Sequence, residues 1–179
     1  MEETTRLIRT FIEIVSLFNN EKLTYCLTGG LAVGIYGIPR ATEGIDLIVI
    51  LKDDGKAKIE SILKKAFSKV IIHKDTLDFT YYNIWRNVIV KDEIYSIILN
   101  LLICENQFIE SILNRKKIIT LDNIEIPIIS IEDLIILKLL SNRPQDKIDM
   151  ESLMLSDHTI DTHLIKDIIK SHLLPVRFS

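Results

Sequence analysis

The sequence predicts an α+β protein in which a β-rich middle lies between helices and an all-helical part follows. Apolar residues at helical spacing predict amphipathic helices over residues 3–19 and Lys56–Phe67. Short apolar runs bounded by turn residues predict strands between the helices. From Ile131 onward the pattern is helical. We therefore expect a core over residues 1–129 and a C-terminal helical subdomain over residues 130–179 that packs on it.

The separate elements follow from local patterns. The expected strands are Leu23–Thr28, Ile45–Leu51, Val70–His73, Phe79–Tyr82, Trp85–Val90, Ile94–Cys104, Lys117–Leu121 and Ile124–Ile128. The further expected helices are Leu31–Tyr36, Phe108–Leu113, 131–141, 144–155 and 161–172. Lys91–Glu93 and Asp122-Asn123 interrupt apolar runs and predict hairpin loops.

Composition limits the class of protein. A chain of 179 residues can bury a core that needs no disulfide or metal. Its net charge of −3 argues against a broad nucleic-acid surface, although a local basic groove is compatible with it. No apolar run reaches the roughly 20 residues of a membrane span, and the N-terminus lacks a signal-peptide pattern. Cys26 and Cys104 lie in apolar runs, so we expect thiols and a reducing cytoplasm.

The stretch Thr28–Leu51 carries the clearest functional signal. It begins with a Gly-Gly turn into a helix, where glycine lets a phosphate approach the backbone, although any tight turn can use glycine. Asp46 heads a strand expected to be buried on both faces, where a charge is costly unless something binds it. Asn100 lies inside a second such strand, and the two side chains face each other if the strands are neighbours. Each is also compatible with an ordinary buried polar group.

Lys138 lies on the apolar face of the helix 131–141. A lysine there either extends its ammonium group to solvent or directs it at a phosphate. Asp146 falls in the first turn of the next helix, where the helix dipole favours a carboxylate. Both residues are candidates for a site, each with an ordinary structural alternative.

These residues resemble a known pattern. Thr28–Gly30, followed after a helix and a loop by Thr42–Leu47, resembles the Gly-Gly/Ser…Asp-x-Asp signature of the nucleotidyltransferase superfamily. The stretch GGLAVGIYGIPRAT resembles the minimal nucleotidyltransferases and the AbiEii/AbiGii-type toxin group. Ile129–Leu153 is similar to a helical segment of that group. The resemblance extends from about Tyr25 to Leu155.

The resemblance implies a nucleotidyltransferase fold, with a small mixed sheet flanked by helices and a helical C-terminal part that closes a nucleotide cleft. It implies transfer of a nucleoside monophosphate from an NTP to a hydroxyl of an RNA end, a protein or a small molecule, with weakly bound Mg²⁺ or Mn²⁺. A toxin of this kind would have an antitoxin partner. The implied site residues are Asp46 and Lys138 (catalytic), Thr28, Gly29, Gly30, Arg40, Arg143 and Asp146 (nucleotide-binding), and Asp46 and Asn100 (metal).

Two positions depart from the family pattern. The first metal-binding Asp of the family falls at Gly44, and its third carboxylate falls at Asn100. Glu43 does not replace the first, because alternate residues of a strand point to opposite faces. Bridging carboxylates hold the two metal ions of such reactions, so we expect nucleotide binding with impaired transfer. The alternative is a non-catalytic nucleotide-binding or toxin–antitoxin module on the same fold.

Overall fold

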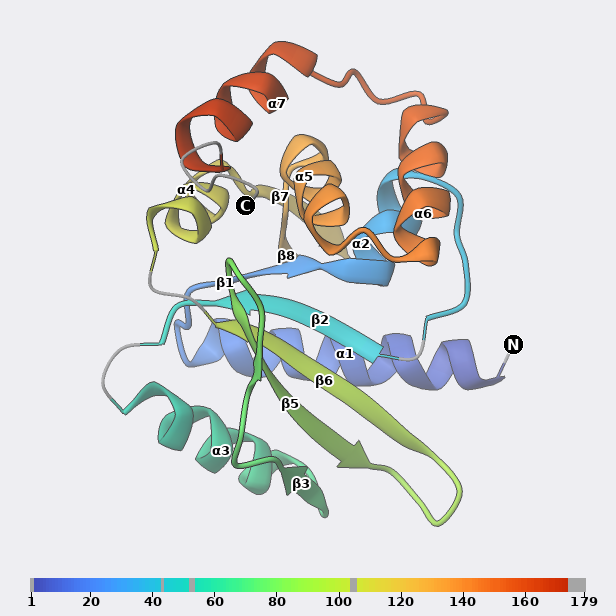
Figure 1. Cartoon of the computed structure of the whole chain (residues 1–179). Helices are drawn as coiled ribbons and strands as arrows, with labels where there is room; N and C mark the ends of the chain where they lie inside the picture. The colour runs from blue at the N-terminus through green and yellow to red at the C-terminus, as the bar shows by residue number, and fades with distance from the viewer. Residues whose placement is uncertain (1, 43, 52–53, 104–105, 174–179) are drawn as a thin grey trace.

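One mixed sheet forms the centre of the protein in a computed structural model that describes residues 2–42, 44–51, 54–103 and 106–173 (Figure 1). The strands are β1 Tyr25–Thr28, β2 Gly44–Val49, β3 Val70–Ile72, β4 Leu77–Asp78, β5 Asn83–Val90, β6 Ser96–Ile103, β7 Lys117–Leu121 and β8 Ile124–Ile128. Their order is β3-β5-β6-β2-β1-β8-β7, with β4 paired to β5. The pairs β2–β6 and β1–β8 are parallel and the others are antiparallel, so the expected fold class is confirmed.

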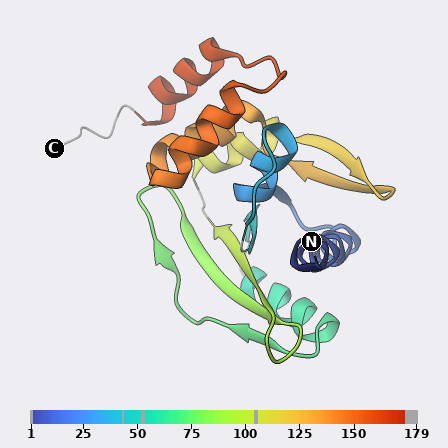
Figure 2. The ribbon, with the colours of Figure 1, turned by 90° about the vertical axis from the view of Figure 1, so that its right-hand side faces the viewer.

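Helices cover this sheet. They are α1 Glu2–Asn20, α2 Gly29–Tyr36, α3 Gly55–Ala66, α4 Gln107–Arg115, α5 Ile131–Ser141, α6 Pro144–Met154 and α7 Thr162–Ile168, which continues into a π-helical turn, Ile169–Leu173. Helix α1 lies behind the sheet in Figure 1 and is seen end-on to one side of it in Figure 2. Helix α2 packs on β1 and β2 and also contacts α5 and α6. These three helices and the ends of β1 and β2 position the site.

Strand β2 is buried on both faces except at one residue. Each of its six residues is buried apart from Asp46, which is half-buried. Parallel pairing with β6 covers one edge of β2, and antiparallel pairing with β1 covers the other. The sequence-based expectation of a central buried strand with one carboxylate is therefore confirmed, and Asp46 opens toward a cleft.

One predicted strand is wrong. Residues 79–82 form a turn between β4 and β5, because the backbone N–H of Phe79 donates to the carbonyl of Tyr82 at 3.0 Å. The two rings stack across this turn with centroids 5.3 Å apart. The other predicted elements exist with ends shifted by a few residues. Cys104 and Glu43 lie outside the described residues.

The C-terminal helices share the core of the sheet. Ser130 caps α5 by accepting a hydrogen bond from the backbone N–H of Asp133, and Ile131–Lys138 are all buried. The same hydrophobic cluster contains residues from both sides of position 130, so the proposed subdomain boundary stays a prediction. In the described part of the chain, no helix has the length and apolar character needed to cross a bilayer.

Candidate nucleotide cleft

A row of polar side chains crosses four neighbouring strands. Thr28 of β1 pairs in register with Asp46 of β2, and Asp46 pairs with Asn100 of β6. Asn100 in turn pairs with Arg86 of β5. Directly paired residues project from the same face of a sheet, so this row lies on one face. The prediction that Asp46 and Asn100 face each other is confirmed.

Hydrogen bonds connect three members of this row. The amide nitrogen Nδ2 of Asn100 donates to Oδ1 of Asp46 at 2.8 Å. The Nε of Arg86 donates to Oδ1 of Asn100 at 3.0 Å. A carboxylate only accepts and a guanidinium only donates, so the two partners together fix the orientation of the amide. Asn100 therefore links a cation to a carboxylate.

The Gly-Gly turn lies directly against Asp46. Gly29 has a φ of +66°, and a Cβ built there would overlap the Asp46 carboxylate. A Cβ on Gly30 would lie 2.7 Å from Oγ1 of Thr42. Thr28 is the N-cap of α2 but makes no side-chain hydrogen bond to the helix. Glycine is thus required by close packing, and the start of α2 faces the cleft without a side-chain cap.

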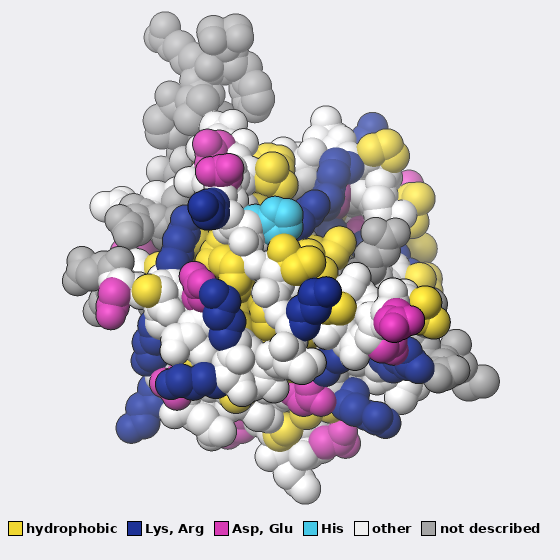
Figure 3. Space-filling model, turned by 90° about the horizontal axis from the view of Figure 1, so that it is seen from below, with side chains coloured by type: hydrophobic (Ala, Val, Ile, Leu, Met, Phe, Trp, Pro, Cys, Tyr) yellow, Lys and Arg dark blue, Asp and Glu magenta, His cyan; other side chains and the backbone are white. Residues whose placement is uncertain are grey.

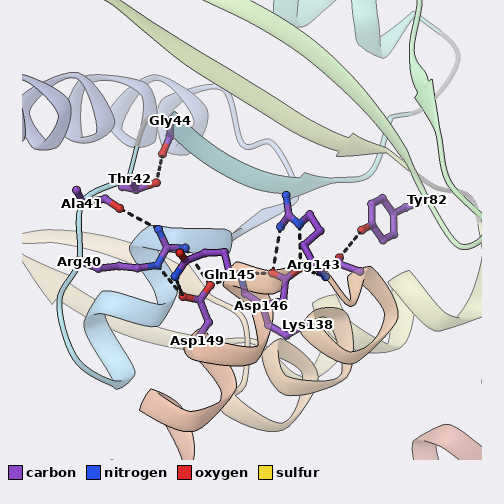
Figure 4. A network of polar contacts seen from close by, with 11 residues as sticks. Arg40, Ala41, Thr42, Gly44, Tyr82, Lys138, Arg143, Gln145, Asp146 and Asp149 are labelled. Carbon is purple, nitrogen blue, oxygen red and sulfur yellow. Dashed lines mark hydrogen bonds and ion pairs between the residues drawn. The ribbon is translucent and has the colours of Figure 1, made fainter.

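The helical wall of the cleft is an ionic cluster, which Figure 4 shows. The Nζ of Lys138 donates to Asp146 at 3.0 Å and to Asp149 at 2.7 Å. Arg40 binds Asp149 through two nitrogens, at 2.6 and 2.9 Å. Arg143 binds Asp146 through two nitrogens, at 2.8 and 3.1 Å. The sequence predicted that Lys138 either extends to solvent or points at a phosphate. The structure instead pairs it with two carboxylates of α6, which packs against α5.

Both carboxylates of the cluster are strongly stabilised as anions. Burial by itself raises the pKa of Asp146, but hydrogen bonds from Arg143 and Lys138 outweigh burial and lower the pKa. Asp149 behaves in the same way, with hydrogen bonds from Arg40, Lys138 and Gln145. The hydrogen bond to Asp146 also raises the pKa of Arg143. These side chains are therefore poor candidates for proton transfer at neutral pH.

The polar row and the three cations of the ionic cluster line one cleft of about 570 Å³. That volume lies within the range of roughly 300–1,000 Å³ that is usual for small-molecule sites. Apolar and aromatic surface comes from Phe79, Tyr82, Ile84, Ile98, Leu102, Leu134 and Leu137. The predicted residues Thr28, Gly29, Gly30, Arg40, Asp46, Asn100, Lys138 and Arg143 all line the cleft, whereas Asp146 lies behind Lys138 and Arg143.

The cleft and its supporting cluster carry an excess of positive charge. The cations are Arg40, Arg86, Lys138 and Arg143, and the carboxylates are Asp46, Asp146 and Asp149. The chain as a whole has a net charge of −3, and the face in Figure 3 mixes Lys and Arg with Asp and Glu. The positive excess is thus local, and it favours an anionic ligand.

The residues present do not fit a pair of metal ions. A Cβ on Gly44 would lie 2.7 Å from the carbonyl oxygen of Ile98, so no side chain enters there without moving a strand. The oxygen of Asn100 accepts from Arg86 and its NH₂ faces Asp46, which does not suit the predicted metal role of Asn100. Asp46 is the one carboxylate in the row, and the described residues contain no cluster of three or more metal-ligand side chains.

Sequence reasoning missed two residues of the site. Arg86 was not singled out, although the predicted hairpin at Lys91–Glu93 brings its strand beside that of Asn100. Asp149 was given no role, yet it holds both Arg40 and Lys138. The signal for Asp149 was its position one helical turn after Asp146. No local pattern indicated that Arg40, from a distant loop, would reach it.

Comparisons with known proteins agree with this architecture. A family model described as "Nucleotidyltransferase of unknown function (DUF6036)" matches residues 5–176. No curated protein sequence matches the chain. A protein from Thermotoga maritima assigned to the nucleotidyltransferases has a TM-score of 0.58 at 17% identity, over 84% of this chain and 93% of that one.

An antibiotic adenylyltransferase and an antibiotic-resistance factor have similar folds. The lincosamide antibiotic adenylyltransferase LnuA, solved with lincomycin, has a TM-score of 0.54 at 17% identity, over 82% of this chain and 96% of that one. The antibiotic-resistance factor ANT(2″)-Ia has a TM-score of 0.58 at 13% identity, over 93% of this chain and 90% of that one. At these identities the likeness concerns the fold, whereas the family model covers nearly the whole chain. The chain therefore belongs to the nucleotidyltransferase family DUF6036.

Proposed function

We propose that this protein binds a nucleoside triphosphate in the cleft. The triphosphate lies along the Thr28–Gly30 turn and meets Arg40 and Arg143 from the helical wall. The observation that carries the proposal is the start of α2, which has no side-chain cap and faces a cleft of excess positive charge. An uncapped helix start and nearby guanidinium groups both favour phosphate.

The reaction of such a site is transfer of a nucleoside monophosphate to a hydroxyl. The acceptor oxygen attacks the α-phosphorus, the bond from that phosphorus to the bridging oxygen breaks, and pyrophosphate leaves. Asp46 is the nearest carboxylate to the turn and is the candidate for positioning the acceptor or taking its proton. Without a carboxylate at Gly44 or Asn100 we expect transfer to be slow, because losing one preorganised group commonly costs about 10²–10³ in rate.

The acceptor class is a small hydroxyl compound, an RNA end or a protein. The antibiotic adenylyltransferase and the antibiotic-resistance factor, by their descriptions, act on or bind small molecules, which favours the first class for an initial screen. A label-transfer assay with each acceptor class and labelled NTP tests this step. Label transfer that is unchanged in Asp46→Ala would rule out this site as its source.

Nucleotide titration calorimetry tests the binding proposal directly. We expect saturable binding of at least one of ATP, GTP, CTP and UTP with Mg²⁺ present. Arg143→Gln should weaken it about tenfold, because a hydrogen bond to a charged group contributes about 1.5–3 kcal/mol. The Arg143 side chain is 68% exposed, and Lys138 still binds Asp146 when Arg143 is replaced, so we expect the core to stay intact. Arg9→Gln, exposed on α1, is the matched control and should bind as the parent does. Absence of binding by all four nucleotides would contradict the proposal.

The second candidate is a non-catalytic nucleotide-binding module, such as a toxin–antitoxin component. The close approach of Gly44 to Ile98 supports it, because restoring the missing carboxylate is sterically difficult. Nucleotide binding without label transfer to any acceptor class would favour this candidate over a slow enzyme.

A further inference from the structure

Arg86 is the one cleft cation without a carboxylate partner in the described ranges, 2–42, 44–51, 54–103 and 106–173. Its Nε donates to Asn100, and its other N–H groups have no protein acceptor among those residues. Arg40, Lys138 and Arg143 are each bound to Asp146 or Asp149. Burying ionic groups without compensation is costly, so a free guanidinium in a cleft indicates a place for an anion.

Because Asn100 is an amide and not a carboxylate, no metal ion is needed to screen two negative charges at this position. A carboxylate there would stand where the amide NH₂ now lies, 2.8 Å from Oδ1 of Asp46. Two carboxylates at that distance repel each other unless a cation or a proton lies between them. The amide instead donates to Asp46 and orients Arg86, so Asp46 and Asn100 are paired without a metal ion.

We propose that Arg86, oriented by Asn100, takes the role that divalent metal has in related sites and binds the phosphates of the nucleotide directly. Binding of the polyphosphate group then does not require Mg²⁺. The inference rests on the proposed nucleotide-binding function and extends it to a phosphate-binding residue and to independence from metal. A guanidinium suits this role because its planar N–H groups match the oxygens of a phosphate.

The test is calorimetry with inorganic tripolyphosphate and with ATP, each in excess EDTA and in excess Mg²⁺. Tripolyphosphate isolates the phosphate contacts from those of base and sugar. For the parent, both ligands should bind in EDTA with affinities within a fewfold of those in Mg²⁺. Arg86→Gln should weaken tripolyphosphate about tenfold or more in EDTA, and Arg86→Lys should recover part of that loss. Arg9→Gln removes the same charge outside the cleft and should have little effect.

Asn100→Asp provides the converse variant. It places a second carboxylate beside Asp46, so tripolyphosphate binding should become weak in EDTA and should recover with Mg²⁺. Thermal unfolding of each variant distinguishes lost binding from lost folding. Binding by the parent only in Mg²⁺, or equal binding by Arg86→Gln, would overturn this inference and leave the proposed function standing. Failure of ATP to bind the folded parent in either condition would overturn both.

Discussion

The wall of the cleft formed by α5, α6 and the loop of Arg40 carries three cations that are all paired with buried carboxylates. On the wall formed by the sheet, the cation Arg86 is held by an amide. Asp146 and Asp149 are at most 1% exposed, and the side chain of Lys138 is 6% exposed. On the sheet wall, Asp46, Asn100 and Arg86 are all half-buried and reach the cleft. Both walls therefore contain cations and carboxylates, but the carboxylates are buried on one wall and half-buried on the other.

The difference separates the buried groups Lys138, Asp146 and Asp149, which hold the fold, from the more exposed guanidinium groups, which a ligand can reach. A buried ion pair that loses one partner leaves a charge without compensation, so the helical cluster is expected to matter first for stability. In the half-buried row of the sheet, Arg86 uses only its Nε to bind Asn100 and keeps its other N–H donors for a ligand. We therefore expect this row to matter first for binding. We therefore expect Lys138, a catalytic candidate from the sequence, to act first by joining α5 to α6.

The largest expected effect tests this role of Lys138. Lys138→Met should lower the free energy of unfolding by about 3 kcal/mol, because Asp146 and Asp149 both lose a buried partner. Urea denaturation monitored by circular dichroism measures this change. Lys147→Met, exposed on the same α6, should change stability by less than about 0.5 kcal/mol. A stable Lys138→Met variant that has lost nucleotide binding would instead support the catalytic role predicted from the sequence.

A second, smaller effect concerns the glycine that brings the turn against the sheet wall. Gly29→Ala should destabilise the protein by about 2 kcal/mol, because Gly29 has a positive φ and its Cβ would meet Asp46. Gly34→Ala in the same helix is the matched control, since the nearest heavy atom to its Cβ is 3.7 Å away. That control should be neutral or slightly stabilising, since alanine favours helix more than glycine does. Equal effects of the two substitutions in thermal unfolding would argue against close packing at Asp46.

The last expected effect is a pH dependence of stability that comes from the ionic cluster. The lowered pKa values of Asp146 and Asp149 mean that their stabilisation is present above about pH 4, the ordinary carboxyl range, and is lost as pH falls below it. The free energy of unfolding of Asp149→Asn should therefore lie furthest below that of the parent at neutral pH. The gap between the two free energies should become smaller in acid. Urea denaturation over a pH series measures it. Asp122→Asn, in the exposed β7–β8 turn, should keep the pH dependence of the parent.

The sequence by itself determined most of the element order, although it missed β4 and assigned residues 79–82 to a strand. It also indicated the buried strand at Asp46 and the glycine turn before it. These features depend on local rules: apolar periodicity, the left-handed backbone that glycine permits, and the rarity of charge in buried strands. The sequence also indicated that Asp46 and Asn100 could face each other, because both of their strands look fully buried. The parallel pairing of β2 with β6 places the two residues opposite each other.

Only the tertiary structure decided what the cations do. From the sequence, Lys138, Arg40 and Arg143 all looked like phosphate ligands. In the structure each of them binds a carboxylate of α6, either Asp146 or Asp149. Arg86 became a candidate only once the β5–β6 register placed it beside Asn100, since a hairpin shifted by one residue points it to the other face. A residue's charge is written in the sequence, but its partner is set by register and by helix packing, which join segments that are far apart in the chain.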